Sequence, residues 1–168
     1  NETPWGFSKF LQIAKSEKLP RIVSVQNPYS LVNRSYEVGM SEISLRENAG
    51  LLAYSPLAAG YLTGKYRNNQ IPKNSRMDLF YDNYPRYHNE RTYKAVDEYF
   101  NIAQKHKISL TQLSQAFVNS RDFVTSNIIG ATTMKQLKEN IDSVDISLDK
   151  EIMDEINLIH ENIPNPAP

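Results

Sequence analysis

Glycine and polar residues follow an apolar run near position 130, in a pattern that suits nucleotide binding. The segment from Gly130 to Thr133 is followed by Gln136, Glu139 and Asn140. A glycine lets a ligand approach the backbone closely, and the free N–H groups that begin a helix attract anions. The three polar residues are spaced to share one helical face. The alternative interpretation is a capped helix with a solvated face.

A second segment of small residues could also hold a phosphorylated ligand. It extends from Tyr54 to Gly60 and is followed by Lys65. Small side chains leave room for the ligand, and a lysine can meet a phosphate as a point charge. The glycine and lysine spacing of a P-loop is absent, so that class of site is excluded. A glycine-rich surface loop with an exposed lysine is the alternative.

The third candidate is Gln26, which follows the β-branched run Ile22 to Val25. Its side-chain amide offers both a donor and an acceptor to an amide-bearing ligand, although it could equally be a satisfied glutamine at a sheet rim. Binding sites of parallel α/β folds lie at the carboxyl ends of the strands. Three polar segments at three such ends therefore favour one shared site.

The elements that position these segments alternate between helix and buried strand, which indicates a parallel α/β fold. We expect strands over 21–26, 51–55 and 123–129. Helices are expected over 36–48, 90–106 and 111–119, the last opened by a capping box of Ser109 and Gln112. Three further helices begin at Thr3-Pro4, at a capping box of Thr133 and Gln136, and at Ser147. Their expected inward residues are Phe7, Phe10, Leu11 and Ala14; Met134, Leu137, Ile141 and Val144; and Ile152, Ile156 and Ile159.

Two segments lack helical or strand periodicity. The stretch from 56 to 88 is expected to be irregular, with a lid-like loop over 67–88, because loops of this length are usually functional. Positions 163–168 contain three prolines and form a non-helical tail. The length of 168 residues favours a single domain over 1–168.

Composition excludes several classes of function. With 19 basic and 19 acidic residues the net charge is zero, so nucleic acid is not an expected partner. No apolar run is long enough to span a membrane, and no leader peptide is expected. The absence of cysteine excludes thiolate chemistry and fits a cytoplasmic protein. His88, His106 and His160 lack metal-ligand spacing and are expected at the surface. Because the first residue is Asn1, we expect a processed or partial polypeptide.

The three segments together resemble the aldo-keto reductase superfamily, over essentially the whole chain. The similarity is to its Tas-like branch, which is itself similar to the potassium-channel β-subunits. It rests on residues 25–31 with Asn33 and Arg34, on 53–66 and on 130–140. The spacing from Gly130 to Gln136, Glu139 and Asn140 matches the dinucleotide segment of that family.

The resemblance implies the carboxyl-terminal half of a TIM (β/α)8 barrel that binds NADP(H) across the carboxyl ends of its strands. Asn1 and Gln26 would hold the nicotinamide carboxamide. The residues implied for the nicotinamide side and the pyrophosphate are Tyr54, Ser55, Pro56, Leu57, Ala58 and Gly60. Lys65 would lie near the phosphates, and Arg76 would hold the adenine end. The residues implied for the adenosine ribose and its 2′-phosphate are Gly130, Thr132, Gln136, Glu139 and Asn140.

The sequence departs from the family in one respect, because the catalytic Asp, Tyr, Lys and His motifs have no match. We therefore expect no catalytic residue and no metal ligand here, and no carbonyl reduction by this chain alone. An open half-barrel would expose two sheet edges and an apolar inner face. It would need the missing amino-terminal half-barrel, or a second copy, as a partner.

The function implied is an NADP(H)-dependent oxidoreductase that reduces small aldehydes or ketones to alcohols, with this chain supplying most of the cofactor site. A non-catalytic nucleotide-binding or regulatory module is the alternative from another class. An inactive fragment held by self-association is the third possibility.

Overall fold

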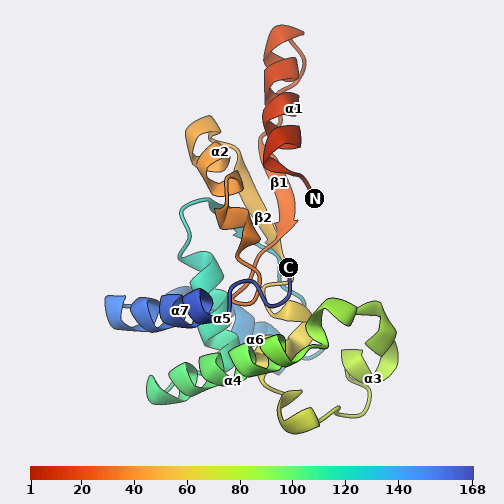
Figure 1. The fold of residues 1–168 in the computed structure, drawn as a ribbon, viewed down its shortest axis with the longest axis vertical. Helices are drawn as coiled ribbons and strands as arrows, with labels where there is room; N and C mark the ends of the chain where they lie inside the picture. Colours follow the sequence, from red (N-terminus) through yellow and green to blue (C-terminus); the bar gives the residue numbers. More distant parts are fainter.

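Three short strands form a parallel sheet in the order β1-β2-β3 (Figure 1). The structure is a computed structural model that describes residues 1–168. The strands are β1 (Ser24–Pro28), β2 (Gly50–Tyr54) and β3 (Val124–Asn127). All three were expected from their apolar runs, and the first is displaced toward Pro28 because Arg21 to Val23 precede the paired segment.

One face of the sheet is buried and the other is open. Val25, Leu51 and Ala53 are buried. On the opposite face, Gln26 is the Cα partner of Leu52, and Leu52 is the partner of Ser126. Gln26 and Ser126 are exposed and Leu52 is half-buried. The expectation of an apolar inner face is therefore wrong, since polar residues alternate with the buried ones along these strands.

Seven α-helices accompany the sheet. They are α1 (Pro4–Ser16), α2 (Met40–Glu47), α3 (Arg76–Phe80), α4 (Glu90–Lys105), α5 (Leu110–Asn119), α6 (Met134–Asp142) and α7 (Lys150–Asn162). In Figure 1, α1 and α2 flank the upper part of the sheet, α4 to α7 gather at the lower end, and α3 lies in a lobe to the right.

Helix caps follow the sequence signals in most places. Ser109 and Gln112 form the expected capping box of α5. At α6, Thr133 caps the helix, but the Gln136 side chain accepts from Thr132 rather than from the capping residue, so that box is incomplete. The last helix begins at the cap Asp149, not at Ser147, because the Asp149 carboxylate accepts the Ile152 N–H at 2.9 Å.

The expected inward face holds for α7, where Ile152, Ile156 and Ile159 are buried, but only partly for α1 and α6. Phe7, Leu11 and Ala14 are buried, whereas Phe10 is exposed because α1 lies at the edge of the molecule. In α6 and the turn after it the expected apolar residues Met134, Ile141 and Val144 are exposed. The helix instead turns Asn140 and Ser143 inward, where hydrogen bonds hold them.

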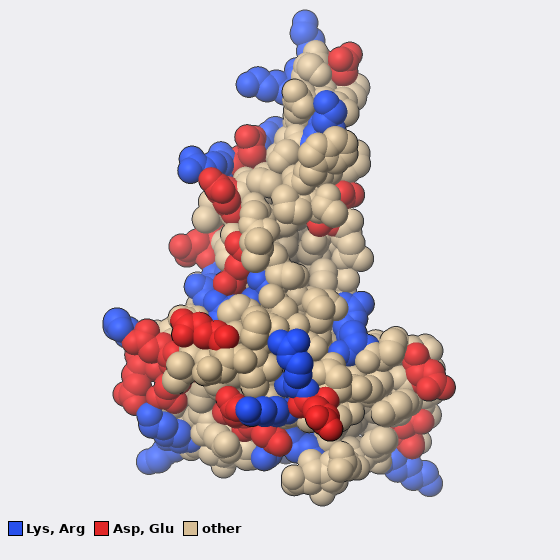
Figure 2. Space-filling view, viewed as in Figure 1, with Lys and Arg blue, Asp and Glu red and all other residues tan.

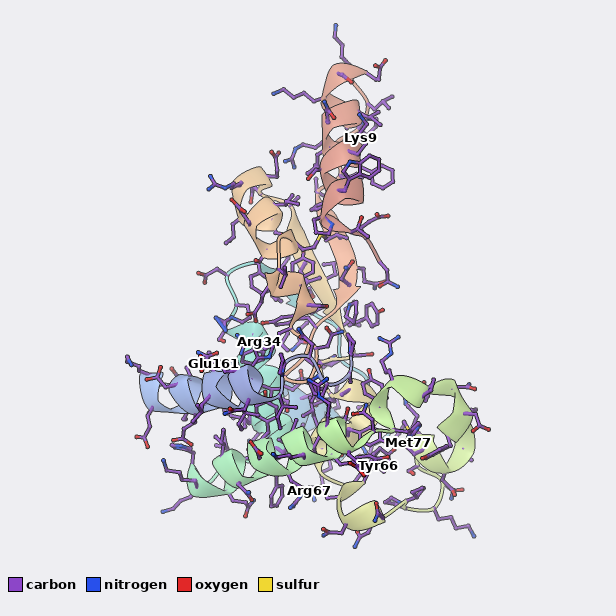
Figure 3. The ribbon with its side chains drawn as sticks, in the orientation of Figure 1. Lys9, Arg34, Tyr66, Arg67, Met77 and Glu161 are labelled. Carbon is purple, nitrogen blue, oxygen red and sulfur yellow. The ribbon has the colours of Figure 1, made fainter.

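The segment between β2 and α4 is more ordered than the sequence suggests. It contains α3 and several short 3-10 turns, so it is not wholly irregular. The Tyr66 hydroxyl accepts the Met77 N–H at 3.3 Å, and both side chains are buried, side by side in Figure 3. Arg67 pairs with Asp97 of α4 at 2.5 Å. These contacts fasten the lid-like loop 67–88 to the helical body.

The tail 163–168 is non-helical, as expected, and it is packed rather than free. Ile163 and Ala167 are buried. The Ala167 N–H donates to the Val32 carbonyl at 3.1 Å, and the Asn165 side chain accepts the Arg34 N–H at 2.6 Å. The tail thereby connects the loop after β1 to the rest of the chain.

None of the helices is long and apolar enough to cross a membrane. Figure 2 shows basic and acidic side chains interspersed over the visible face, in keeping with the net charge of zero.

Candidate functional site

The carboxyl ends of the three strands meet at one edge of the sheet. Pro28 is the Cα partner of Tyr54, and Ala53 is the partner of Asn127. The segments that follow the strands therefore start side by side, as the sequence argument requires. These are the loop from Tyr29, the loop from Ser55 and the loop from Ile128, whose N–H donates to the Ala53 carbonyl at 2.8 Å.

The first two residues of the chain join this edge beside β1. The Asn27 side chain accepts the Glu2 N–H and donates to the Glu2 carbonyl, both at 2.9 Å. The Tyr54 hydroxyl donates to the Asn1 side chain at 2.9 Å. Asn1 and Tyr54, two expected site residues, are thus brought together. Gln26 is exposed, and its side-chain amide makes no hydrogen bond within the chain.

The loop after β2 has an unusual backbone. Ser55, Ala58 and Ala59 have positive φ values of 55°, 49° and 54°. Such conformations cost free energy in residues other than glycine and cluster at ligand sites. The N–H groups of Ser55 and Leu57 donate to no oxygen of the chain. This loop therefore presents free donors at the sheet edge.

Lys65 belongs to the same loop and has no anionic partner. Its Nζ lies 5.0 Å from the centre of the Tyr66 ring. A Cβ at Gly60 would stand 3.3 Å from that Nζ, and Gly60 has a φ of +102°, so glycine is required there. No carboxylate lies within 4.0 Å of the ammonium group. A half-buried, unpaired cation in the same loop as free N–H groups suits an anion.

Residues 128 to 136, which form the loop after β3 and the first turn of α6, are exposed. Nothing lies within 4 Å of a Cβ built on Gly130, which leaves open space beside the backbone. Thr132 donates through its N–H and its hydroxyl to the Gln136 side chain, both at 2.9 Å. Glu139 accepts the Ser109 hydroxyl at 2.5 Å. The Gln136 and Glu139 side chains are thus engaged within the chain.

Asn140 is buried, unlike most of the other expected site residues. Its side chain donates to the Gly130 carbonyl at 3.3 Å and accepts from Gln115 at 3.2 Å. Gln115 in turn accepts from Asn127 at 2.7 Å. Gln115 and Asn127 are not among the residues predicted from the sequence. A long amide side chain among the buried residues of α5 is the signal that could have identified the first of them.

Arg76 lies at the start of α3, outside this edge. It is exposed, and its guanidinium donates to the Tyr84 hydroxyl at 3.1 Å. None of its hydrogen bonds reaches the strand ends, so the structure does not bring it together with the other expected residues.

The three histidines are less free than expected from the sequence. His88 is half-buried and is held by the Tyr61 hydroxyl and the Tyr81 carbonyl, both at 2.9 Å. His106, Glu151 and Glu155 lie close enough together to ligate a metal. The Lys105 ammonium, 2.7 Å from each carboxylate, compensates their charge instead. His160 is half-buried, and burial lowers its pKa.

A buried ion pair supports the loop after β1. The Arg34 guanidinium donates to both carboxylate oxygens of Glu37 at 2.8 Å and to Asn157 of α7 at 2.9 Å. Figure 3 shows Arg34 beside α7. The Tyr29 hydroxyl also donates to Glu37, at 2.5 Å. Burial raises the pKa of Glu37, but the hydrogen bonds from Arg34 and Tyr29 outweigh it and leave the pKa below its ordinary value.

Residues 5–161 match the model of the aldo/keto reductase family. The chain belongs to this family of oxidoreductases, whose fold is a (β/α)8 barrel, and three parallel strands with outer helices are consistent with part of such a barrel.

Its relatives include Protein tas of Escherichia coli, which is 47% identical over the whole chain and 48% of its own length. An aldo-keto reductase of Babesia bovis is 40% identical over 84% of the chain and 51% of its own length. A probable voltage-gated potassium channel subunit beta of Oryza sativa is 37% identical over 68% of the chain and 36% of its own length. The chain thus spans about half the length of the curated relatives it matches.

Proposed function

We propose that this chain supplies the cofactor-binding side of an NADP(H)-dependent oxidoreductase that reduces small aldehydes or ketones to alcohols. The proposal rests mainly on one observation: three polar loops begin at the same sheet edge, and one of them presents free N–H groups and an unpaired ammonium. Membership of the aldo/keto reductase family supports the reaction class.

The groups at this edge suit a dinucleotide. The free N–H groups of Ser55 and Leu57, together with Lys65, are donors of the kind that bind a pyrophosphate. The start of α6, a helix of 9 residues that follows Gly130 in the chain, adds unpaired N–H groups. The backbone at Gly130 has open space beside it. The free amide of Gln26 can both donate to and accept from a carboxamide. The chemistry of the donor set therefore fits NADP(H).

Each expected residue is then assigned to one part of the cofactor. We assign Gln26 and Asn1 to the nicotinamide carboxamide, with the Tyr54 hydroxyl orienting Asn1. The loop from Ser55 to Gly60 and Lys65 would hold the pyrophosphate. When bound, NADPH supplies a hydride for a carbonyl carbon.

The adenosine end would be held by the loop after β3 and by the lid. We assign Gly130, Thr132, Gln136, Glu139 and Asn140 to the adenosine ribose and its 2′-phosphate. Arg76 would reach the adenine end only if the lid moves, because its present partner is Tyr84.

We further propose that the chain does not reduce carbonyls alone and that the rest of the barrel, or a second copy, must close against it. The outer strands β1 and β3 each have one unpaired edge within this chain. Val23, just before β1, and Trp5 of α1 are 70% and 76% exposed. NADPH oxidation that stays with the protein through careful purification would contradict this part of the proposal.

A fluorescence titration of the purified protein with NADPH, with NADH as the control, tests the function. Saturable binding that favours NADPH is the expected result. Equal affinity for the two would contradict the assignment of the 2′-phosphate to the Gln136 segment, and the absence of binding would contradict a cofactor site that this chain forms by itself.

A nucleotide-binding regulatory module is the second candidate. It is favoured by the similarity to a protein named as a probable potassium channel subunit beta. In that case NADPH would bind, yet no carbonyl reduction would appear when the chain is joined to the remaining barrel.

A further inference from the structure

We propose that Gln115, a residue of α5 outside the predicted site, is a positioning residue for the loop after β3. The loop from Ile128 to Thr133 is exposed throughout, and nothing lies within 4 Å of a Cβ built on Gly130. At the start of the loop, the Ile128 N–H donates to the Ala53 carbonyl. From there to the first turn of α6, one hydrogen bond anchors the loop to a buried group: the Gly130 carbonyl accepts from Asn140. The placement of Gly130 therefore depends on what holds Asn140.

Asn140 is held by a continuous chain of side-chain amides, which we call the amide relay. Its members are Asn127 of β3, Gln115 of α5 and Asn140 of α6. The Asn127 amide donates to Gln115 at 2.7 Å, and Gln115 donates to Asn140 at 3.2 Å. Asn140 then donates to the Gly130 carbonyl at 3.3 Å. The relay joins the end of one strand to two helices and to the loop.

The direction of the relay is fixed by its last acceptor. A backbone carbonyl can only accept, so Asn140 must present its NH₂ group to Gly130 and its oxygen to Gln115. Gln115 must then present its NH₂ group to Asn140 and its oxygen to Asn127. The Oδ1 of Asn127 is left buried without a donor. A reversed amide at any member would place two like groups face to face.

Burial makes the relay selective for these side chains. Gln115 is 0% exposed and Asn140 is 6% exposed. Buried amides without partners are costly, so both residues are constrained to this geometry. Gln115 is too deep to touch a ligand at the sheet edge, and it acts on the loop only through Asn140. Its bearing on cofactor affinity rests on the proposed function, whereas its hold on the loop does not.

Gln115→Met tests the relay, because methionine has a similar size and cannot donate or accept in the same way. Ser114→Ala is the matched control: Ser114 is the neighbouring residue of α5, is equally buried, and bonds only to the Leu110 carbonyl of its own helix. Ser114→Ala loses one buried hydrogen bond and Gln115→Met loses two, but only Gln115→Met interrupts the relay.

Amide hydrogen exchange of the loop is the first readout. The N–H groups of Ile128 and Thr132, which are bonded in the wild type, should exchange up to about tenfold faster in Gln115→Met, the factor that corresponds to one net hydrogen bond. In Ser114→Ala they should exchange at the wild-type rate. Unchanged exchange in Gln115→Met, or equal acceleration in both variants, would overturn the proposal.

A second pair of measurements separates the relay from the proposed function. If Gln115 acts through Asn140, adding Gln115→Met to Asn140→Ala should accelerate loop exchange no further, and additive effects would overturn the relay. NADPH affinity should fall by a similar factor in Gln115→Met and stay unchanged in Ser114→Ala. If the wild type fails to bind NADPH while Gln115→Met still loosens the loop, the relay is upheld and the cofactor assignment alone is contradicted.

Discussion

Replacing Arg34 by methionine should destabilise the protein more than any exposed charge substitution. Arg34 is 7% exposed and stands between the loop after β1 and α7. It donates to both oxygens of Glu37 at 2.8 Å and to Asn157 at 2.9 Å. Its guanidinium also lies 5.2 Å from the centre of the Phe117 ring. Methionine keeps much of the apolar volume but removes all three donors.

The size of the destabilisation follows from the Glu37 carboxylate that Arg34→Met leaves without its cationic partner. Without Arg34, the Glu37 carboxylate keeps only the Tyr29 hydroxyl as a donor, in a site where its side chain is 27% exposed. Removing one partner of a largely buried ion pair costs about 3–5 kcal/mol. For a domain of this size, each kcal/mol lowers the melting temperature by roughly 2–4 °C. We therefore expect Tm to fall by about 6–20 °C.

Urea denaturation followed by circular dichroism measures the change, with Arg46→Met as the control. Arg46 also bonds a glutamate, Glu42, at 2.7 Å, but the two side chains are 76% and 66% exposed. Such a pair contributes about 0.3–0.5 kcal/mol. If Arg34→Met costs no more than Arg46→Met, the inference that burial makes the Arg34 pair important is wrong.

Three further predictions address the site and its supports. Lys65→Met should weaken NADPH binding roughly tenfold at low salt and flatten its salt dependence, because a cation facing phosphate is lost, whereas Lys9→Met on α1 should change neither. Burial lowers the pKa of His160 from its ordinary 6.5, so the stability that neutral His160 contributes is complete above pH 6.5 and should be lost as the pH falls below it. In urea titrations across pH, His160→Gln should remove this part of the loss. An unchanged pH profile would contradict the role of His160 in acid destabilisation. Ser109→Ala removes the cap of α5 and the donor to Glu139, and should cost about 1–2 kcal/mol of unfolding free energy; a loss within error would show that neither bond stabilises the fold.

Local signals in the sequence predict much of this fold. The β-branched run before Gln26 and the run at Leu51 become adjacent parallel strands. The capping box of Ser109 and Gln112 opens α5 where expected. These elements follow from periodicity and side-chain chemistry within a few residues, which is the range over which a single sequence is informative.

The predictions from sequence fail where tertiary contacts decide which residues are buried. Ile141 and Val144 have the spacing of an inward face, but the buried amide of Gln115 draws Asn140 inward instead and turns them to solvent. Pairing of residues 25 positions apart, such as Gln115 and Asn140, leaves no mark on local periodicity. For the same reason, only the family resemblance could place Asn1 and Tyr54 in one site before the structure was known.

Chemical-shift mapping of backbone amides during addition of NADPH shows whether one cofactor molecule binds across the loops after β2 and β3. We expect the amides of Ser55, Leu57, Gly130 and Thr132 to shift together and to saturate at one NADPH concentration, because both loops would hold the same molecule. Saturating shifts confined to the groove between α4 and the loop after β2, at Tyr61, Tyr93 and Asp97, or no saturable shifts at all, would contradict a cofactor site at the carboxyl edge of the sheet.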